Sequence, residues 1–150
     1  MSSWFECKVN YQKIDEQGAE KSVTEPYLID AVSFTDAEVR IHKEMEPYIS
    51  GVFEVKNIKR ANYAELLPSE TGDRWFKCKM SFITMDEEKG KEKRSNAFYL
   101  VQANDVKEAY ETLENLMEGS ISDYEIPAIQ QSHILDVFPY NADHFEETTE

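Results

Sequence analysis

The sequence has little of what builds disulfide-linked, metal-bound or membrane-anchored proteins. It contains two cysteines and three histidines, too few for a disulfide framework and without the spacing of a zinc site. No apolar run reaches the roughly 18–20 residues that span a membrane. The first six residues lack the basic start and the apolar stretch of a signal peptide. We therefore expect a cytoplasmic protein with no metal, no cofactor and no membrane contact.

Basic residues are also scarce, with 16 Lys and Arg against 30 Asp and Glu and a net charge of −14. The negative electrostatic field of such a surface repels nucleic acid, so we expect no direct nucleic-acid binding. Carboxylates are frequent enough that acid pairs arise by chance. No Ser/His/Asp order, nucleophile elbow or glycine-rich phosphate loop stands out. The pattern favours a protein that is not an enzyme.

An internal repeat is the most informative feature present. The segment Trp-Phe-Glu-Cys-Lys at 4–8 recurs as Trp-Phe-Lys-Cys-Lys at 75–79, and later matches pair Tyr27 with Tyr99 and Pro68 with Pro139. Colinear matches of this kind indicate a duplication. The predicted organisation is a single globular domain at 1–142 with repeats at 4–68 and 75–139, a polar linker at 69–74 and a flexible acidic tail at 143–150.

Each copy is predicted to form a hairpin, a helix and a returning strand. Apolar and polar residues alternate along 4–13 and 22–31, which is typical of strands with one buried face. The remaining predicted segments are returning strands at about 52–58 and 123–130, and short strands or short helices at 61–67 and 132–138.

The two helices have recognisable starts. Thr35 and Glu38 have capping-box spacing and Pro47 ends the first helix, while Asp105 and Glu108 cap the second. One helix covers only one face of a sheet, and a unit of about 65 residues is marginal alone. We expect an α+β fold from an internally duplicated ββαβ(β) unit, with an antiparallel sheet, both helices packed on it, a shared core and a pseudo-two-fold axis.

The alternation also predicts a candidate binding surface. Both tryptophans and two leucines point away from the face that carries Cys7 and Cys78, which we interpret as small core residues. Apolar side chains on an outer face form a patch for a protein partner or a second copy. The alternative is that a loop, the other copy or the segment before each proline covers them. The candidate patch consists of Trp4, Leu28, Trp75, Leu100, Lys8 and Lys79.

Three function classes compete on these observations. The leading one is a non-enzymatic interaction module that binds a protein partner or itself through the outer face and the sheet edges. The second is a binding or sequestering protein for a small, nucleotide-like ligand, with Tyr27, Tyr99, Trp4 and Trp75 stacking on a base. The third is an acidic mimic of nucleic acid that inhibits a host protein.

Four segments together carry a resemblance to a known family. They are the two Trp-Phe-x-Cys-Lys openings, Thr-Glu-Pro-Tyr-Leu-Ile-Asp-Ala at 24–31 and Ser-Phe-Thr-Asp-Ala-Glu at 33–38. The chain resembles a family of small uncharacterised proteins, a domain of unknown function from Bacteroides-type gut bacteria and their phages. The resemblance runs from residue 4 to about residue 140. It implies an intracellular protein of a phage or mobile element and assigns no functional residue.

Overall fold

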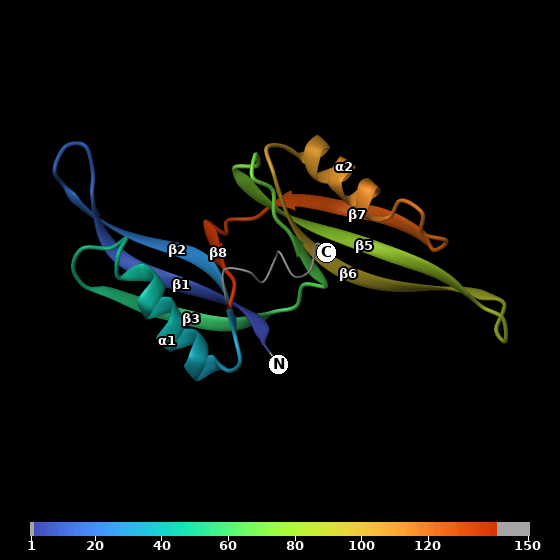
Figure 1. Cartoon of the computed structure of the whole chain (residues 1–150), viewed down its shortest axis with the longest axis horizontal. Helices are drawn as coiled ribbons and strands as arrows, with labels where there is room; N and C mark the ends of the chain where they lie inside the picture. The colour runs from blue at the N-terminus through green and yellow to red at the C-terminus, as the bar shows by residue number, and fades with distance from the viewer. Residues whose placement is uncertain (1, 141–150) are drawn as a thin grey trace. The chain divides into compact units, whose positions relative to one another are not determined.

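The structure of this chain is a computed structural model that describes residues 2–140. The chain divides into two compact units. Unit 1 comprises the chain up to Ala61 together with the segment from His133 onward, and unit 2 comprises Asn62–Ser132. Each unit is a four-stranded sheet with one helix on one of its faces (Figure 1).

Unit 1 contains four strands and the helix α1. Its elements are β1 (Ser3–Ile14), β2 (Glu20–Ala31), α1 (Phe34–Met45), β3 (Phe53–Ala61) and β8 (Asp136–Phe138). The strand order is β3-β1-β2-β8. The first three strands pair antiparallel, whereas the short β8 pairs parallel with β2. In Figure 1 the red β8 accordingly lies beside the blue β2.

Unit 2 has the corresponding composition. Its elements are β4 (Glu65–Leu67), β5 (Arg74–Asp86), β6 (Lys91–Ala103), α2 (Val106–Leu116) and β7 (Asp123–Gln131). The strand order is β4-β6-β5-β7, in which β4 pairs parallel with β6 and the other pairings are antiparallel. The short strand of each sheet therefore follows, in the chain, the last long strand of the other sheet.

The α+β class is confirmed, but the expectation of one sheet carrying both helices is wrong. The chain forms two sheets, each with its own helix and one parallel pairing. The segments at 61–67 and 132–138, left open between strand and helix, contain the short strands β4 and β8. Because each short strand joins the sheet of the other repeat, the units do not coincide with the repeats at 4–68 and 75–139.

Each unit has its own cluster of buried side chains between its sheet and its helix. In unit 1, Phe5, Cys7 and Ile29 pack with Ile41 and Met45 of α1. Unit 2 repeats the arrangement, with Leu113 of α2 packed against the inner residues of β5 and β6. Phe138 of β8 packs against the first cluster and Leu67 of β4 against the second. Each core is thus completed by a residue of the short strand, and this strand comes in the chain directly after the last long strand of the other unit.

The start of α1 differs from the prediction. The N-cap is Ser33 rather than Thr35, and its Oγ accepts a hydrogen bond of 3.0 Å from the N–H of Asp36. The Asp36 carboxylate accepts from the N–H of Val32 at 2.9 Å, one residue before the cap. The helix therefore starts two residues earlier than predicted. In α2 the predicted cap is confirmed, since Asp105 Oδ1 accepts from the N–H of Glu108 at 2.8 Å.

The linker at 69–74 is joined to β6 by hydrogen bonds. The N–H of Ser69 donates to Gln102 Oε1 at 2.9 Å, and Gln102 Nε2 donates to the carbonyl of Gly72 at 3.0 Å. A Cβ at Gly72 would lie 2.7 Å from the backbone nitrogen of Ala103, closer than ordinary contacts allow. Only glycine fits this approach of the two backbones.

Two further expectations concern the chain ends and membranes. The predicted tail at 143–150 lies outside the described residues. Neither of the two helices in residues 2–140 has the length and apolar character needed to cross a membrane.

Candidate functional site

The face assignment made from the alternation holds, but the predicted exposure of the outer patch is wrong at three residues. Leu28 and Leu100 are fully buried and Trp75 is 6% exposed, while Trp4 is half-buried. None of these four belongs to the clusters that pack beneath α1 and α2, as expected for the opposite face. The two leucines are therefore not part of an exposed apolar patch.

The short strands explain part of this burial. Leu28 pairs with Val137 of β8, and Leu100 pairs with Leu66 of β4. Both partners are themselves largely buried. The alternative stated from the sequence, that segments before the prolines cover the leucines, therefore agrees with the strand pairing.

The lysines of the predicted patch lie in two environments. Lys8 is exposed on β1 and Lys79 is half-buried on β5. The neighbouring basic residues of β3 are engaged locally, since Lys56 lies 3.1 Å from Glu54 and Lys59 lies 3.5 Å from Glu6. These contacts leave β3 without the concentrated positive charge that an anion site requires.

Cys7 and Cys78 have the character of core residues. Both are free thiols in the interior of their units. Burial, with a smaller contribution from Glu6, raises the pKa of Cys7 to about 12. Burial alone raises the pKa of Cys78 to about 12. A thiol that ionises so high is a poor nucleophile at neutral pH.

A pocket of about 200 Å³ opens in unit 1, where the end of α1 meets β2 and β8. Its lining residues come from three separated parts of the chain, namely Tyr27, Met45, Tyr48, Leu135, Asp136 and Phe138. Tyr27 and Phe138 lie with their ring centroids 5.9 Å apart and form one wall. The pocket therefore combines three aromatic rings, two aliphatic side chains and one carboxylate.

Carboxylates lie close to two tyrosines of unit 1, Tyr27 and Tyr11. The Tyr27 hydroxyl donates to Glu25 Oε1 at 3.3 Å. Burial is the largest cause that raises the pKa of Tyr27 well above its usual value, followed by the charge of Glu25, and the charge of Asp136 makes the smallest contribution. A hydrogen bond to the same Glu25, together with partial burial, raises the pKa of Tyr11 to about 12. The tyrosines therefore stay protonated and neutral at physiological pH.

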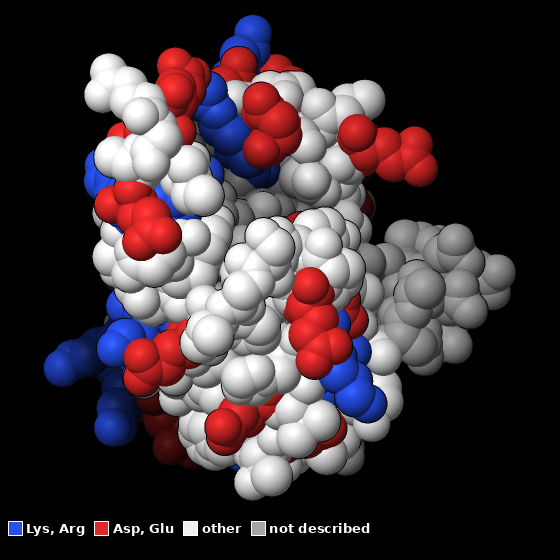
Figure 2. All heavy atoms as spheres, turned by 90° about the vertical axis from the view of Figure 1, so that its left-hand side faces the viewer, with Lys and Arg blue, Asp and Glu red and all other residues white. Residues whose placement is uncertain are grey.

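Acidic side chains elsewhere do not form a continuous row on the visible face. In Figure 2 the red carboxylates are scattered among uncharged and basic side chains. A mimic of nucleic acid needs its charges repeated along one line, as phosphates are. This face does not favour that interpretation.

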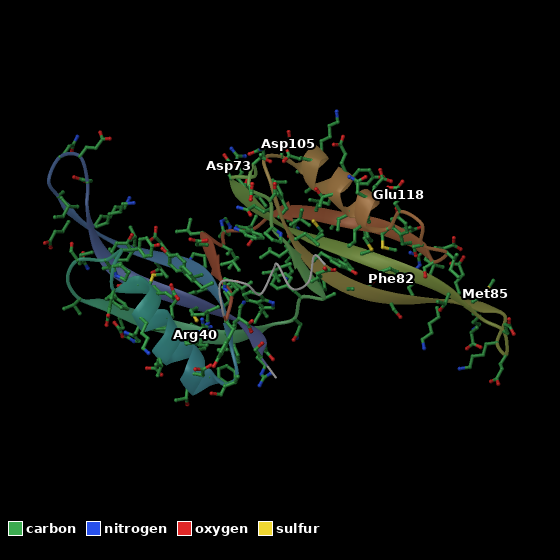
Figure 3. All side chains as sticks on the ribbon, viewed as in Figure 1. Arg40, Asp73, Phe82, Met85, Asp105 and Glu118 are labelled. Carbon is green, nitrogen blue, oxygen red and sulfur yellow. The ribbon has the colours of Figure 1, made fainter. Side chains whose placement is uncertain are left out.

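Arg40 lies on α1 (Figure 3) and contacts the chain just beyond β8. Its guanidinium donates to the carbonyls of Asp30, Pro139 and Tyr140, the last two at 3.1 and 3.2 Å. It also lies 4.6 Å from the ring centroid of Tyr140. By fixing the residues that follow Phe138, Arg40 positions β8 and with it two lining residues of the pocket.

Unit 2 lacks the same pocket lining. Glu65 pairs with Tyr99 as Asp136 pairs with Tyr27, so the carboxylate and the tyrosine recur. The other positions differ, because Leu67 stands in the pairing where Phe138 stands in unit 1. Counted from the two N-caps, Ser33 and Asp105, residue Ser120 takes the place of Tyr48. The aromatic character of the pocket is particular to unit 1.

Sequence reasoning found Tyr27 but missed the rest of the pocket. Tyr48, Leu135 and Phe138 lie outside the alternating stretches, and their proximity depends on the pairing of β8 with β2. The signal that was available is the departure from the repeat, where an aromatic ring in one copy faces a small or aliphatic residue in the other.

No arrangement of metal ligands is apparent in the described part of the chain, where no group of three His, Cys, Asp or Glu residues could hold an ion. No curated protein and no solved structure matches the sequence. The family model for a domain of unknown function, DUF4494, matches residues 3–140, which is nearly the whole described chain. The protein therefore belongs to the DUF4494 family of domains of unknown function.

Proposed function

We propose that this protein is a non-enzymatic interaction module that binds a protein partner through the pocket of unit 1. The observation that carries the proposal is the open aromatic pocket with two exposed apolar residues at its rim. Tyr48 is 73% exposed and Leu135 is 53% exposed, although both are large hydrophobic side chains. Clustered exposed apolar side chains around a concavity are typical of interaction sites.

The size of the pocket favours a protein partner over a nucleotide-like ligand. Pockets for drug-sized ligands enclose about 300–1,000 Å³. The unit 1 pocket, at about 200 Å³, has room for a single side chain. Aromatic anchors that receive one side chain are typical of hot spots in protein interfaces.

The chemistry of the residues supports a role without catalysis. The two thiols are buried with raised pKa values, and the pocket tyrosine Tyr27 also has a raised pKa. His42 lies 5.0 Å from the ring of Phe53, in a packing contact. Neither the thiols nor Tyr27 has the lowered pKa that activates a nucleophile.

We also infer that the repeats at 4–68 and 75–139 descend from one duplicated ββαβ(β) segment. Supporting this, both sheets have the same strand order when read from β3 and from β7. A register shift occurs after Lys8 in β1 and after Lys79 in β5, at matching positions of the repeat. The pseudo-two-fold relation, the intracellular location and the phage or mobile-element origin stay predictions from the sequence.

The proposal is tested by recovering the tagged full-length protein from its native host and measuring its co-purifying proteins by mass spectrometry. Tyr48→Ala and Leu135→Ala should each remove the partner, because both truncate the rim of the pocket. Light scattering on the same variants detects self-association, since a second copy is the alternative occupant.

Matched control variants lie in unit 2. Tyr110→Ala removes a tyrosine that is 43% exposed on α2, and Ile121→Ala removes a fully exposed isoleucine. Both should retain the partner. If all four variants keep the same partners and the same mass in solution, the pocket is not the interaction site and the proposal fails.

A further inference from the structure

The lining of the unit 1 pocket selects for positive charge. Three of the six lining side chains are aromatic rings, whose faces carry negative electrostatic potential. The only ionisable carboxylate among the six is Asp136, and no lysine or arginine is among them. A cation entering the pocket meets rings and a carboxylate, whereas an anion meets no fixed positive charge.

The carboxylate has a defined position. Asp136 Oδ1 accepts a hydrogen bond of 2.8 Å from the N–H of Val137, and the strand pairing places Asp136 beside Tyr27. Glu25 adds a second carboxylate at the hydroxyl end of the Tyr27 ring, 3.3 Å away. The tyrosine ring is thus flanked by negative charge on two sides.

The one guanidinium that holds the neighbouring chain is already engaged. Arg40 donates to three backbone carbonyls and stacks on Tyr140, so its charge is directed to those carbonyls and that ring. The net charge of −14 adds a long-range attraction for basic partners.

We infer that the pocket receives a lysine or arginine side chain of the protein partner. This inference rests on the proposed function and names the chemistry of the residue that the partner inserts. The aliphatic stem of that side chain contacts Leu135 and Met45, while its charged end lies against the rings of Tyr48 and Phe138 and near Asp136. The volume of about 200 Å³ fits one such side chain.

The experiment uses the full-length protein and four capped pentapeptides of the form Gly-Gly-X-Gly-Gly. X is arginine, lysine, citrulline, which is the neutral isostere of arginine, or norleucine, which keeps the stem without the charge. Binding is followed by the backbone amide shifts in two-dimensional NMR spectra. The shifts of Tyr27, Tyr48 and Phe138 report on the pocket, and those of Tyr99 and Leu67 report on the corresponding place in unit 2.

We expect the arginine and lysine peptides to cause saturable shifts at the unit 1 residues and none at the unit 2 residues. The citrulline and norleucine peptides should bind roughly three- to thirtyfold more weakly, as expected for the loss of a cation–aromatic contact. Tyr48→Ala and Asp136→Asn should each reduce the affinity for the charged peptides, and added salt should do so as well. Tyr110→Ala should leave the affinity unchanged.

Equal binding of charged and neutral peptides, or shifts confined to unit 2, would overturn the inference. So would the absence of shifts with every peptide at concentrations where a weak millimolar site fills. The outcome is separable from that of the proposed function. If Tyr48→Ala abolishes partner binding while the peptides show no charge preference, the pocket receives an uncharged side chain and only this inference fails.

Discussion

The guanidinium of Arg40 lies 4.6 Å from the centre of the Tyr140 ring, although the two residues are 100 positions apart in the chain. The contact joins the helix of unit 1 to the segment that follows β8. A three-residue parallel strand makes few hydrogen bonds of its own, so its attachment depends on contacts at its ends. Arg40 supplies such a contact.

Arg40→Ala should therefore loosen β8. We expect a loss of roughly 1–3 kcal/mol in the free energy of unfolding, because hydrogen bonds from a charged donor to three carbonyls are removed. Arg40→Lys should recover only part of it, since an ammonium lacks the planar fork. Urea denaturation measures the loss of unfolding free energy in both variants. Hydrogen exchange at the amides of Val137 and Phe138 measures how far β8 loosens. Unchanged protection of these amides would contradict the role, and exposed Lys43→Ala is the control.

Leu28→Ala and Leu100→Ala test whether these leucines are buried or lie on an exposed surface. Both side chains are fully buried, so each truncation should cost about 2–5 kcal/mol of unfolding free energy. Val52→Ala, at a residue that is 91% exposed, should change stability by less than about 0.5 kcal/mol. Thermal or urea denaturation decides between the two. A small effect at both leucines would mean that they lie on an accessible face after all.

Ser33→Ala and Thr35→Ala test which residue caps α1. Because the Ser33 hydroxyl accepts from the N–H of Asp36, its removal should cost about 0.5–2 kcal/mol. Thr35 lies inside the helix and is exposed, so Thr35→Ala should be close to neutral. Denaturation of the two variants side by side gives the answer. The reverse order of effects would restore Thr35 as the cap.

The two thiols should make the protein less stable at alkaline pH. Folding raises the pKa of Cys7 and of Cys78 from the ordinary value of 9.0 to about 12. The folded state therefore holds these protons more tightly than the unfolded chain. Their contribution to stability is complete below pH 9 and is lost as the pH rises from 9 toward 12. The urea midpoint, measured between pH 8 and pH 11, should fall over that range.

Alkylation provides an independent check on the thiols. Iodoacetamide at pH 8 should leave Cys7 and Cys78 unmodified in the native protein and modify both in urea, as mass spectrometry would show. Rapid modification under native conditions would contradict their burial. The raised pKa of Tyr11, held mainly by its hydrogen bond to Glu25, acts on stability in the same direction above pH 10.

The candidate site was largely beyond the reach of the sequence. Periodicity assigned Leu28 to the face opposite the helix, but a period of two cannot say whether that face is covered. The pocket residues Tyr27, Tyr48 and Phe138 come from segments with no local relationship, so no spacing rule connects them. The cap of α1 was misplaced because Ser33 and Thr35 are both good cap residues two positions apart, and in the structure it is Ser33 that accepts the capping hydrogen bond.

The amino-acid sequence by itself determined the long strands, the two helices and the residues that each presents to its core. These follow from alternation, from helical periodicity and from capping residues, which act over a few neighbouring positions. Only the tertiary structure decided that there are two sheets, that β4 and β8 each join the sheet of the other repeat, and that Phe138 thereby reaches Tyr27. Strands of three residues have too little local preference to choose their partner, so the choice is made by the nonlocal burial of Leu66, Leu67, Val137 and Phe138.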